Sequence, residues 1–136
     1  YSQERYADAL GPMEEGIRIA RASDIEVKEQ WLLLLRVLHY ELENFEEVAV
    51  ILEELITRFP KKQYWLQLSG IYSELEDPKR RLITLEMAYV QGLFDKEQEF
   101  MNLAQLLMQE EIPYRGALVL QDGIDKGIVE RSYKNL

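Results

Sequence analysis

Cysteine is absent from this chain of 136 residues, and histidine occurs only once. The absence of cysteine excludes disulfide bonds, thiolate metal sites and a cysteine nucleophile, and it is compatible with an oxidising or a reducing compartment. Long apolar runs are absent as well. The run Trp31–Leu35 is far shorter than the roughly 20 residues needed to cross a bilayer. We therefore expect no direct membrane insertion.

Positive charge is also scarce. The chain has 16 lysine and arginine residues against 25 aspartate and glutamate residues, which gives a net charge of −9. A nucleic-acid partner requires a clustered basic surface, so we expect none. Apolar residues make up 47% of the chain. This content is sufficient for a hydrophobic core and predicts one folded unit.

The main positive feature of the sequence is an internal repeat. The apolar residues of the segment Trp31–Phe45 recur in the segment Tyr64–Pro78 at a shift of 33 residues. A third copy follows at a shift of 35, in which Phe100 takes the place of Trp65. Self-similarity at this period indicates a repeat protein.

Each copy has the pattern of two amphipathic helices joined by a short turn. Pro60 ends one helix, whereas Pro78 and Pro113 open two others. Gly92 and Gly127 stand where a helix needs a left-handed residue at its end. The predicted helices span residues 1–21, 28–42, 45–58, 62–75, 78–91, 96–109 and 113–126.

The repeat boundaries lead to an expectation about the ends of the chain. Residues 1–21 match the second helix of a partial repeat, residues 28–61, 62–95 and 96–129 are full repeats, and residues 130–136 start a further one. In the linker before residue 28, Ser23 or Asp24 is suited to cap the next helix. Solenoids normally close with polar capping elements. We therefore expect a single array of about seven helices plus a truncated last one, cut from a longer protein.

The residue types at equivalent positions are typical of one family. The bulky position of the first helix is Leu32, Trp65 and Phe100, the second helix opens at Phe45, Pro78 and Pro113, and its small residues include Ala88, Gly116 and Gly123. In these positions the helix pairs resemble tetratricopeptide repeats over essentially the whole chain. The resemblance implies an all-α, right-handed superhelical α-solenoid.

Two arginines depart from the family pattern. Arg36 and Arg81 occupy positions where tetratricopeptide repeats usually place a small residue between the two helices. A long side chain there either extends to the edge of the helix pair or forms an ion pair with an acidic residue such as Glu47, Glu76 or Glu86.

In arrays of this family, the first helices line a concave surface that binds partners. We expect it to hold an extended peptide or an amphipathic helix, with amide side chains bonding to the backbone of the partner. The lysine and arginine clamp that grips a terminal carboxylate is absent from the matching positions. Alternatively, Leu33, Leu34 and Val37 are covered by the next helix. The predicted groove residues are Gln30, Leu33, Leu34, Val37, Tyr40, Gln63, Leu66, Gln67, Gly70, Ser73, Gln98, Met101, Asn102, Gln105 and Met108, with Glu74 on the same face.

A narrower resemblance concerns location. The segments at residues 64–68, 88–93 and 113–120 are similar to the periplasmic repeat proteins encoded with TonB-type energy-transduction systems of Gram-negative bacteria. That similarity implies an accessory protein of the envelope in the periplasm. Without it, the cytoplasm is the alternative.

Candidates for chemistry are few. His39 falls on a core-packing position without a nucleophile nearby in sequence, and the acidic run from Glu41 to Glu54 lacks the ligand spacing of a calcium loop. We interpret the acidic run as a solvated flank. We expect no catalysis, metal or cofactor, and predict a protein-interaction scaffold. The alternative is a structural array that self-associates into a homo-oligomer without a separate ligand.

Overall fold

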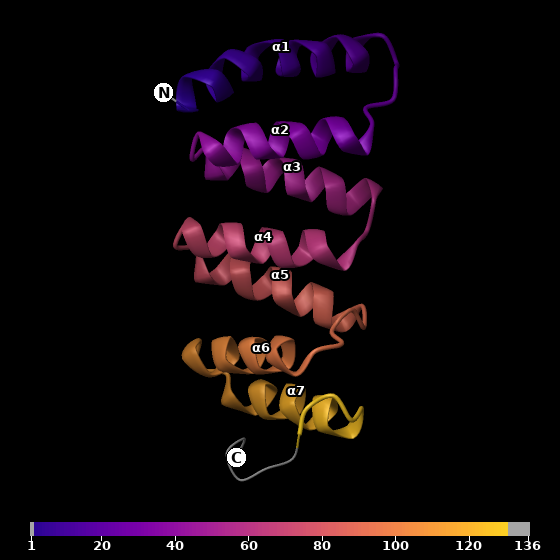
Figure 1. Cartoon of the computed structure of the whole chain (residues 1–136). Helices are drawn as coiled ribbons and strands as arrows, with labels where there is room; N and C mark the ends of the chain where they lie inside the picture. The colour runs from indigo at the N-terminus through magenta and orange to yellow at the C-terminus, as the bar shows by residue number, and fades with distance from the viewer. Residues whose placement is uncertain (1, 131–136) are drawn as a thin grey trace. The chain divides into compact units, whose positions relative to one another are not determined.

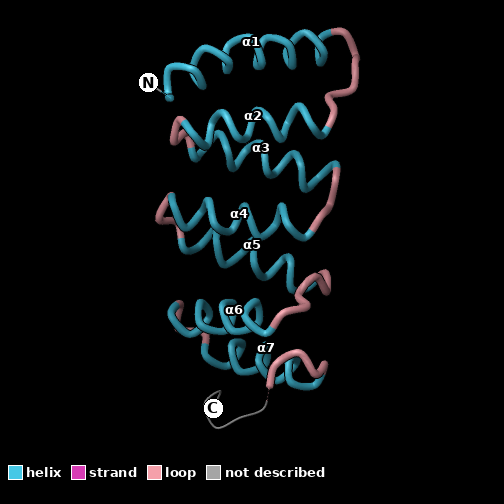
Figure 2. Tube along the Cα trace, viewed as in Figure 1, coloured by secondary structure: helices cyan, strands magenta, loops and turns pink. Residues whose placement is uncertain are grey.

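The computed structural model describes residues 2–130, which form α-helices and loops and no strand (Figure 1, Figure 2). The all-α class is therefore as predicted. Residues 131–136, which belong to the predicted start of a further repeat, lie outside the described residues. The seven helices over this part of the chain are α1 (Ser2–Ala22), α2 (Glu29–Glu41), α3 (Phe45–Arg58), α4 (Lys62–Glu74), α5 (Pro78–Val90), α6 (Glu97–Gln109) and α7 (Pro113–Asp125).

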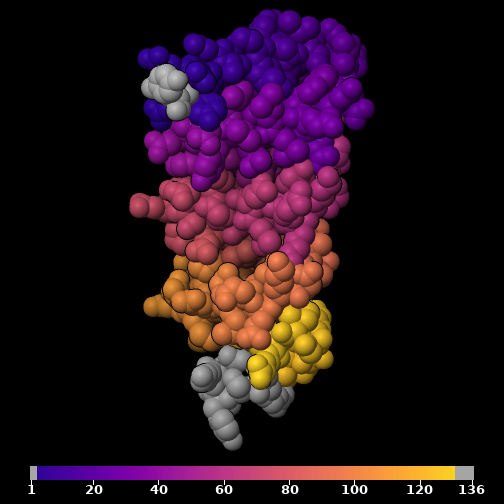
Figure 3. Space-filling model, in the orientation of Figure 1, coloured from indigo at the N-terminus to yellow at the C-terminus, as the bar shows by residue number. Residues whose placement is uncertain are grey.

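Contacts between residues divide the chain into two compact units, which we call the N-terminal unit (Tyr1–Asp77) and the C-terminal unit (Pro78–Leu136). In the N-terminal unit, α1 packs against α2, α2 against α3, and α3 against α4 (Figure 1). The side chains fill the space between neighbouring ribbons, as the indigo and purple region of Figure 3 shows. The core contains Leu32, Leu52, Leu55 and Tyr64, each at most 1% exposed.

In the C-terminal unit, α6 packs against α5 and, more extensively, against α7. Phe100 is fully buried there and lies edge-on to Phe94 and Tyr89, with ring centroids 5.4 and 6.0 Å away. Gly123 on α7 allows this packing, because a Cβ at that position would lie 2.9 Å from the Phe100 ring. A small residue in the second helix is thus required by the close approach of the two helices.

Helix ends repeat one backbone motif. Gly92 and Gly127 have positive φ angles, which confirms their predicted role as left-handed C-terminal residues. The same conformation occurs without glycine at Asp24, Glu43, Glu76 and Glu111. After α2, for example, the Glu43 N–H donates to the Tyr40 carbonyl, and the next N–H donates to the His39 carbonyl.

The expected cap of α2 was wrong. Asp24 belongs to the left-handed end of α1, where its N–H donates to the Arg21 carbonyl. The residue before α2 is instead Lys28, whose side chain makes no capping hydrogen bond. Ser23 and Asp24 form the end of α1, so they lie too far before Glu29 in the chain to cap α2.

Candidate partner-binding site

None of the predicted groove residues is buried in the structure. This includes Leu34 and Val37, which are exposed, and Leu33, which is half-buried. The exposed ones are Gln30, Leu34, Val37, Tyr40, Gln63, Gly70, Ser73, Gln98, Gln105 and Met108, and the half-buried ones are Leu33, Leu66, Gln67, Met101 and Asn102. These residues are therefore at least partly accessible to solvent and are not buried in the core.

Some of these residues meet at one cavity of the N-terminal unit, which we call the α2–α4 cavity. Its volume is about 240 Å³. Four of its lining residues were predicted to share the inward face, namely Tyr40, Gln67, Gly70 and Glu74. Sequence reasoning missed its other lining residues, which are Arg36, Val48, Leu52 and Ile71.

The α2–α4 cavity has an apolar floor and a polar wall. Val48, Leu52 and Ile71 are buried core residues that form the floor. Tyr40 is 46% exposed, and its ring packs edge-on against Phe45 at a centroid distance of 5.7 Å. The Tyr40 ring is therefore packed against Phe45 and is still partly exposed to solvent.

Two of the lining residues, Arg36 and Gln67, also carry polar atoms that lack partners. Arg36 Nε and Gln67 Oε1 are buried, and neither forms a hydrogen bond within the protein. Because both lack a partner, they do not bond to each other. Over the described residues Arg36 also forms no ion pair with the acidic residues proposed for it, so that alternative is not what the structure shows.

A related cavity of about 140 Å³ lies in the C-terminal unit. Four of its lining residues, Asn102, Gln105, Leu106 and Gln109, stand 35 residues after Gln67, Gly70, Ile71 and Glu74 of the α2–α4 cavity. Arg81 lines it as well, and its Nε is again buried without a partner. The two cavities differ in volume and also in their amide groups, because Asn102 Oδ1 accepts a hydrogen bond from Gln98 at 2.7 Å whereas Gln67 Oε1 has no partner.

Two further hollows are apolar. One, of about 340 Å³, lies between α1 and α2 and is lined by Pro12, Met13, Gly16, Ile17, Trp31 and Leu34. The other lies on α5, where Ile83, Met87 and Val90 are exposed. The first hollow was not predicted from the sequence. The sequence feature that could have indicated this hollow is Gly16, which has no side chain to fill the space.

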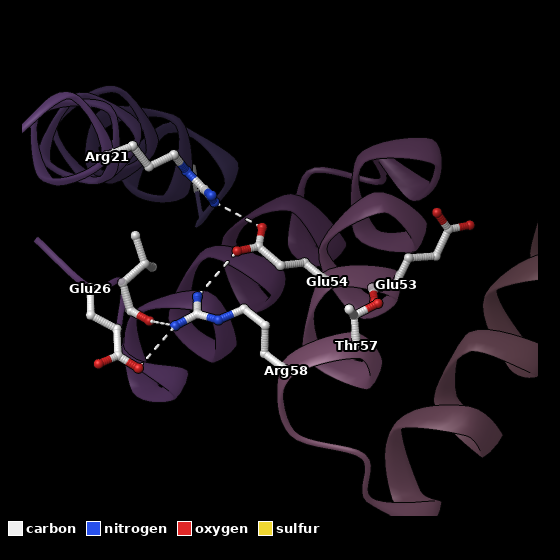
Figure 4. A network of polar contacts seen from close by, with 7 residues as sticks. Arg21, Glu26, Glu53, Glu54, Thr57 and Arg58 are labelled. Atoms are coloured by element: carbon white, nitrogen blue, oxygen red, sulfur yellow. Dashed lines mark hydrogen bonds and ion pairs between the residues drawn. The ribbon is translucent and has the colours of Figure 1, made fainter. Parts of the chain in front are cut away.

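Polar contacts hold α1, the linker and α3 together in the N-terminal unit (Figure 4). Arg21 Nη2 donates to Glu54 at 2.8 Å, and Arg58 donates to Glu54 at 3.2 Å and to the Val27 carbonyl at 2.6 Å. Burial would raise the pKa of Glu54, but the hydrogen bonds and charges of the two arginines outweigh it and lower the pKa below its usual 4.5. This network is structural.

The acidic run is thus only in part a solvated flank. Glu53 accepts a hydrogen bond from the Tyr72 hydroxyl at 2.6 Å and so connects α3 to α4. Glu54 belongs to the network above, whereas Glu41, Glu43 and Glu47 are exposed. Charges in this run serve helix packing wherever a neighbouring helix offers a donor.

His39 is 4% exposed, which confirms that it occupies a packing position. Its Nδ1 lies 3.2 Å from the Asn44 amide nitrogen, and its Nε2 lies 3.5 Å from Glu14. Among residues 2–130, no three histidine, aspartate or glutamate side chains gather as a metal site would require. Within the same range, every helix is too short or too polar to cross a bilayer.

The fold and the cavities define an all-helical protein in which consecutive helices pack within each unit. Comparison with models of known protein families gives no match, and comparison with curated proteins gives no significant match either. The function therefore has to be argued from the cavities themselves.

Proposed function

We propose that this protein is a non-catalytic interaction scaffold that binds a segment of a partner protein in the α2–α4 cavity. The supporting observation is that residues predicted for a partner groove line a cavity with an apolar floor and polar residues around it. Such a combination is typical of sites that take an apolar side chain and orient it with a few polar groups.

We also propose that the helices form a right-handed solenoid of tetratricopeptide-like repeats. The helix pairs recur at shifts of 33 and 35 residues, and the turns within them have the same left-handed glutamate at residues 43, 76 and 111. The equivalent positions of the two cavities give further support, because they arise from the same face of successive first helices.

The proposed location is the periplasm, and the proposed context is a TonB-type energy-transduction system. This part rests on the similarity of the segments at residues 64–68, 88–93 and 113–120 to periplasmic repeat proteins of such systems. Fractionation of cells that carry the tagged gene at its own locus tests the location. Recovery of the protein in the cytoplasmic fraction would contradict it.

A binding experiment tests the scaffold. Envelope and cytosolic extracts are passed over the immobilised chain, retained proteins are identified, and each is purified and titrated back. Gly70→Leu is the informative variant, because nothing lies within 4 Å of a Cβ at Gly70 and the new side chain fills the cavity without disturbing the core. We expect it to weaken binding by at least about tenfold, and Tyr40→Glu to do the same.

Gly16→Leu is the matched control. Gly16 is also helical and also has no atom within 4 Å of a Cβ, but it lines the α1–α2 hollow. Binding that survives Gly70→Leu and is lost with Gly16→Leu would place the site in that hollow and contradict the proposal.

Self-association is the second candidate. It is favoured by the exposed apolar residues of α5, Ile83, Met87 and Val90, which lie along one face of that helix. Sedimentation over a hundredfold range of concentration tests it. A monomer at every concentration would exclude the homo-oligomer.

A further inference from the structure

The apolar hollow between α1 and α2 corresponds to a place that is filled elsewhere in the N-terminal unit. Residues of α1 match residues of α3 at a shift of 39, and residues of α2 match residues of α4 at a shift of 33. The helix pair α1 and α2 is therefore equivalent to the pair α3 and α4. Against this second pair lies α2, which packs on α3 and reaches α4 through the hydrogen bond that the Tyr64 hydroxyl donates to Glu29.

Burial differs between the two equivalent pairs. On α3, Ile51, Leu52 and Leu55 share a core cluster with leucines of α2, and each is at most 7% exposed. Their counterparts in the hollow, none of which is buried, are Pro12, Met13 and Gly16. On the other helix of each pair, Tyr64 is 1% exposed, whereas its counterpart Trp31 is half-buried. The hollow therefore lies where a helix equivalent to α2 would pack.

The residues that receive the first turn of α2 also have counterparts beside the hollow. Glu29, in that first turn, pairs with Lys61 Nζ at 2.9 Å and accepts from the Tyr64 hydroxyl. Lys61 Nζ lies 5.8 Å from the centroid of the Tyr64 ring. At a shift of 33, Lys28 Nζ lies at the same 5.8 Å from the Trp31 ring, and Trp31 lines the hollow. Lys28 forms no ion pair with another described residue.

We propose that the α1–α2 hollow is the docking site for an amphipathic helix of a partner protein, which presents a carboxylate of its first turn to Lys28 and an apolar stripe to the hollow. The expected stripe resembles that of α2, where Leu32, Leu35 and Leu38 are buried. The helix should run antiparallel to α1 and parallel to α2, as α2 does relative to α3 and α4 (Figure 1). This inference goes beyond the proposed function and is independent of it, because it concerns a different surface.

A partner protein is favoured over a second copy of the chain as the source of this helix. The chain carries a net charge of −9, so two copies repel each other. A helix with lysine or arginine along the edges of its apolar stripe is instead attracted to the chain. The occupant is therefore a basic amphipathic helix with one acidic residue in its first turn.

The test uses the full chain and a designed helical peptide. The peptide carries glutamate in its first turn, leucine at the positions that Leu32, Leu35 and Leu38 hold relative to Glu29, and lysine and glutamine elsewhere. A lactam bridge on its outer face holds the helix, because short isolated helices are marginal in water. The peptide has no tryptophan, so binding is followed through the emission of Trp31.

The emission of Trp31 should shift to shorter wavelength as the peptide covers the ring, and Trp31→Phe should abolish the shift. Leu34→Glu places a charge in the hollow at a residue that is 50% exposed, so the fold should persist. We expect this variant to weaken binding by at least about tenfold. Val50→Glu on α3 is the matched control, because Val50 is 59% exposed and lines neither this hollow nor the α2–α4 cavity.

The first-turn contact is tested by charge reversal. Lys28→Glu should weaken binding of the peptide by about twofold to fivefold, because the pair is exposed. A peptide with lysine in place of the first-turn glutamate should show the opposite preference. Lys79→Glu on α5 changes the net charge equally and should have no such effect. Equal effects of Lys28→Glu and Lys79→Glu on both peptides would overturn the contact.

The remaining outcomes separate this docking site from the scaffold proposal. Failure of the peptide to bind, or equal binding by the Leu34→Glu and Val50→Glu variants, would overturn the docking site and leave the α2–α4 cavity untouched. Binding that is lost with Gly70→Leu and kept with Leu34→Glu would place the helix in the α2–α4 cavity and also overturn it. Sedimentation of the chain alone tests the source, since a dimer that Leu34→Glu dissociates would make a second copy the occupant and refute the partner.

Discussion

Arg36 on α2 and Gln67 on α4 line the same cavity, each has a buried polar atom without a partner, and the two atoms do not bond to each other. Unpaired buried polar groups destabilise the free protein, because they lose water without gaining a partner. A protein retains such groups at a cost in stability, and binding sites are where this cost commonly occurs.

The first prediction concerns stability. Gln67→Leu and Arg36→Met replace the unpaired groups by apolar side chains of similar length, so each should raise the free energy of unfolding by about 1 kcal/mol. Urea denaturation of the two variants and of the parent chain measures the change. A loss of stability in both variants would refute the prediction and mean that the two polar groups serve the fold.

Gly123→Ala is expected to destabilise the protein. The new Cβ would lie 2.5 Å from Val129 Cγ2 and 2.9 Å from the Phe100 ring, so these side chains would have to shift. Overpacking of this kind costs about 1–3 kcal/mol, which exceeds the gain of up to about 1 kcal/mol in helix propensity. Gly16→Ala is the control, since nothing lies within 4 Å of its Cβ and it should stabilise. Thermal unfolding of both variants should give shifts of opposite sign, and equal shifts would contradict the close approach of α6 and α7.

Acid should weaken the network of Figure 4 through Glu54. Its pKa is lowered below 4.5 in the folded protein, so its contribution to stability is present above pH 4.5 and is lost as the pH falls through the lowered value. Glu54→Gln should therefore cost about 0.5–1 kcal/mol at neutral pH, and the difference from the parent chain should vanish in acid. Urea unfolding as a function of pH provides the measurement. A constant difference at all pH values would show that the charge of Glu54 is not responsible.

Alkaline pH should destabilise the folded protein through the ionisation of Tyr89. Burial, together with the hydrogen bond and charge of Asp122, raises the pKa of Tyr89 from 10.0 to about 12. A raised pKa favours the neutral phenol in the folded state, so this stability is present below pH 10 and is lost as the pH rises towards 12. The pKa of Tyr64 is also raised, by burial and by its hydrogen bond to Glu29, so the absorbance titration is read as a difference: the late-ionising signal should decrease in Tyr89→Phe and move to lower pH in Asp122→Asn. An unchanged titration curve in both variants would refute the assignment.

Local sequence signals were sufficient for the helices. The bounds of α3 agree with the predicted 45–58, because Asn44 and Pro60 flank a strongly amphipathic segment. Gly92 and Gly127 could be assigned to helix ends since glycine alone adopts positive φ without strain. Glu43, Glu76 and Glu111 could not be assigned in this way, because their residue type does not favour positive φ; there the conformation accompanies backbone hydrogen bonds to the last turn of the preceding helix.

The sequence by itself determined the all-helical class, the repeat period and the face on which Tyr40, Gln67 and Gly70 lie, because periodicity along one chain is enough to place a residue on a face. Only the tertiary structure decided which of these residues meet at a cavity and that Arg36 lines it without a partner for its Nε. Those properties depend on which helices pack together and on what each polar atom finds across the contact. No pattern within a single helix contains that information.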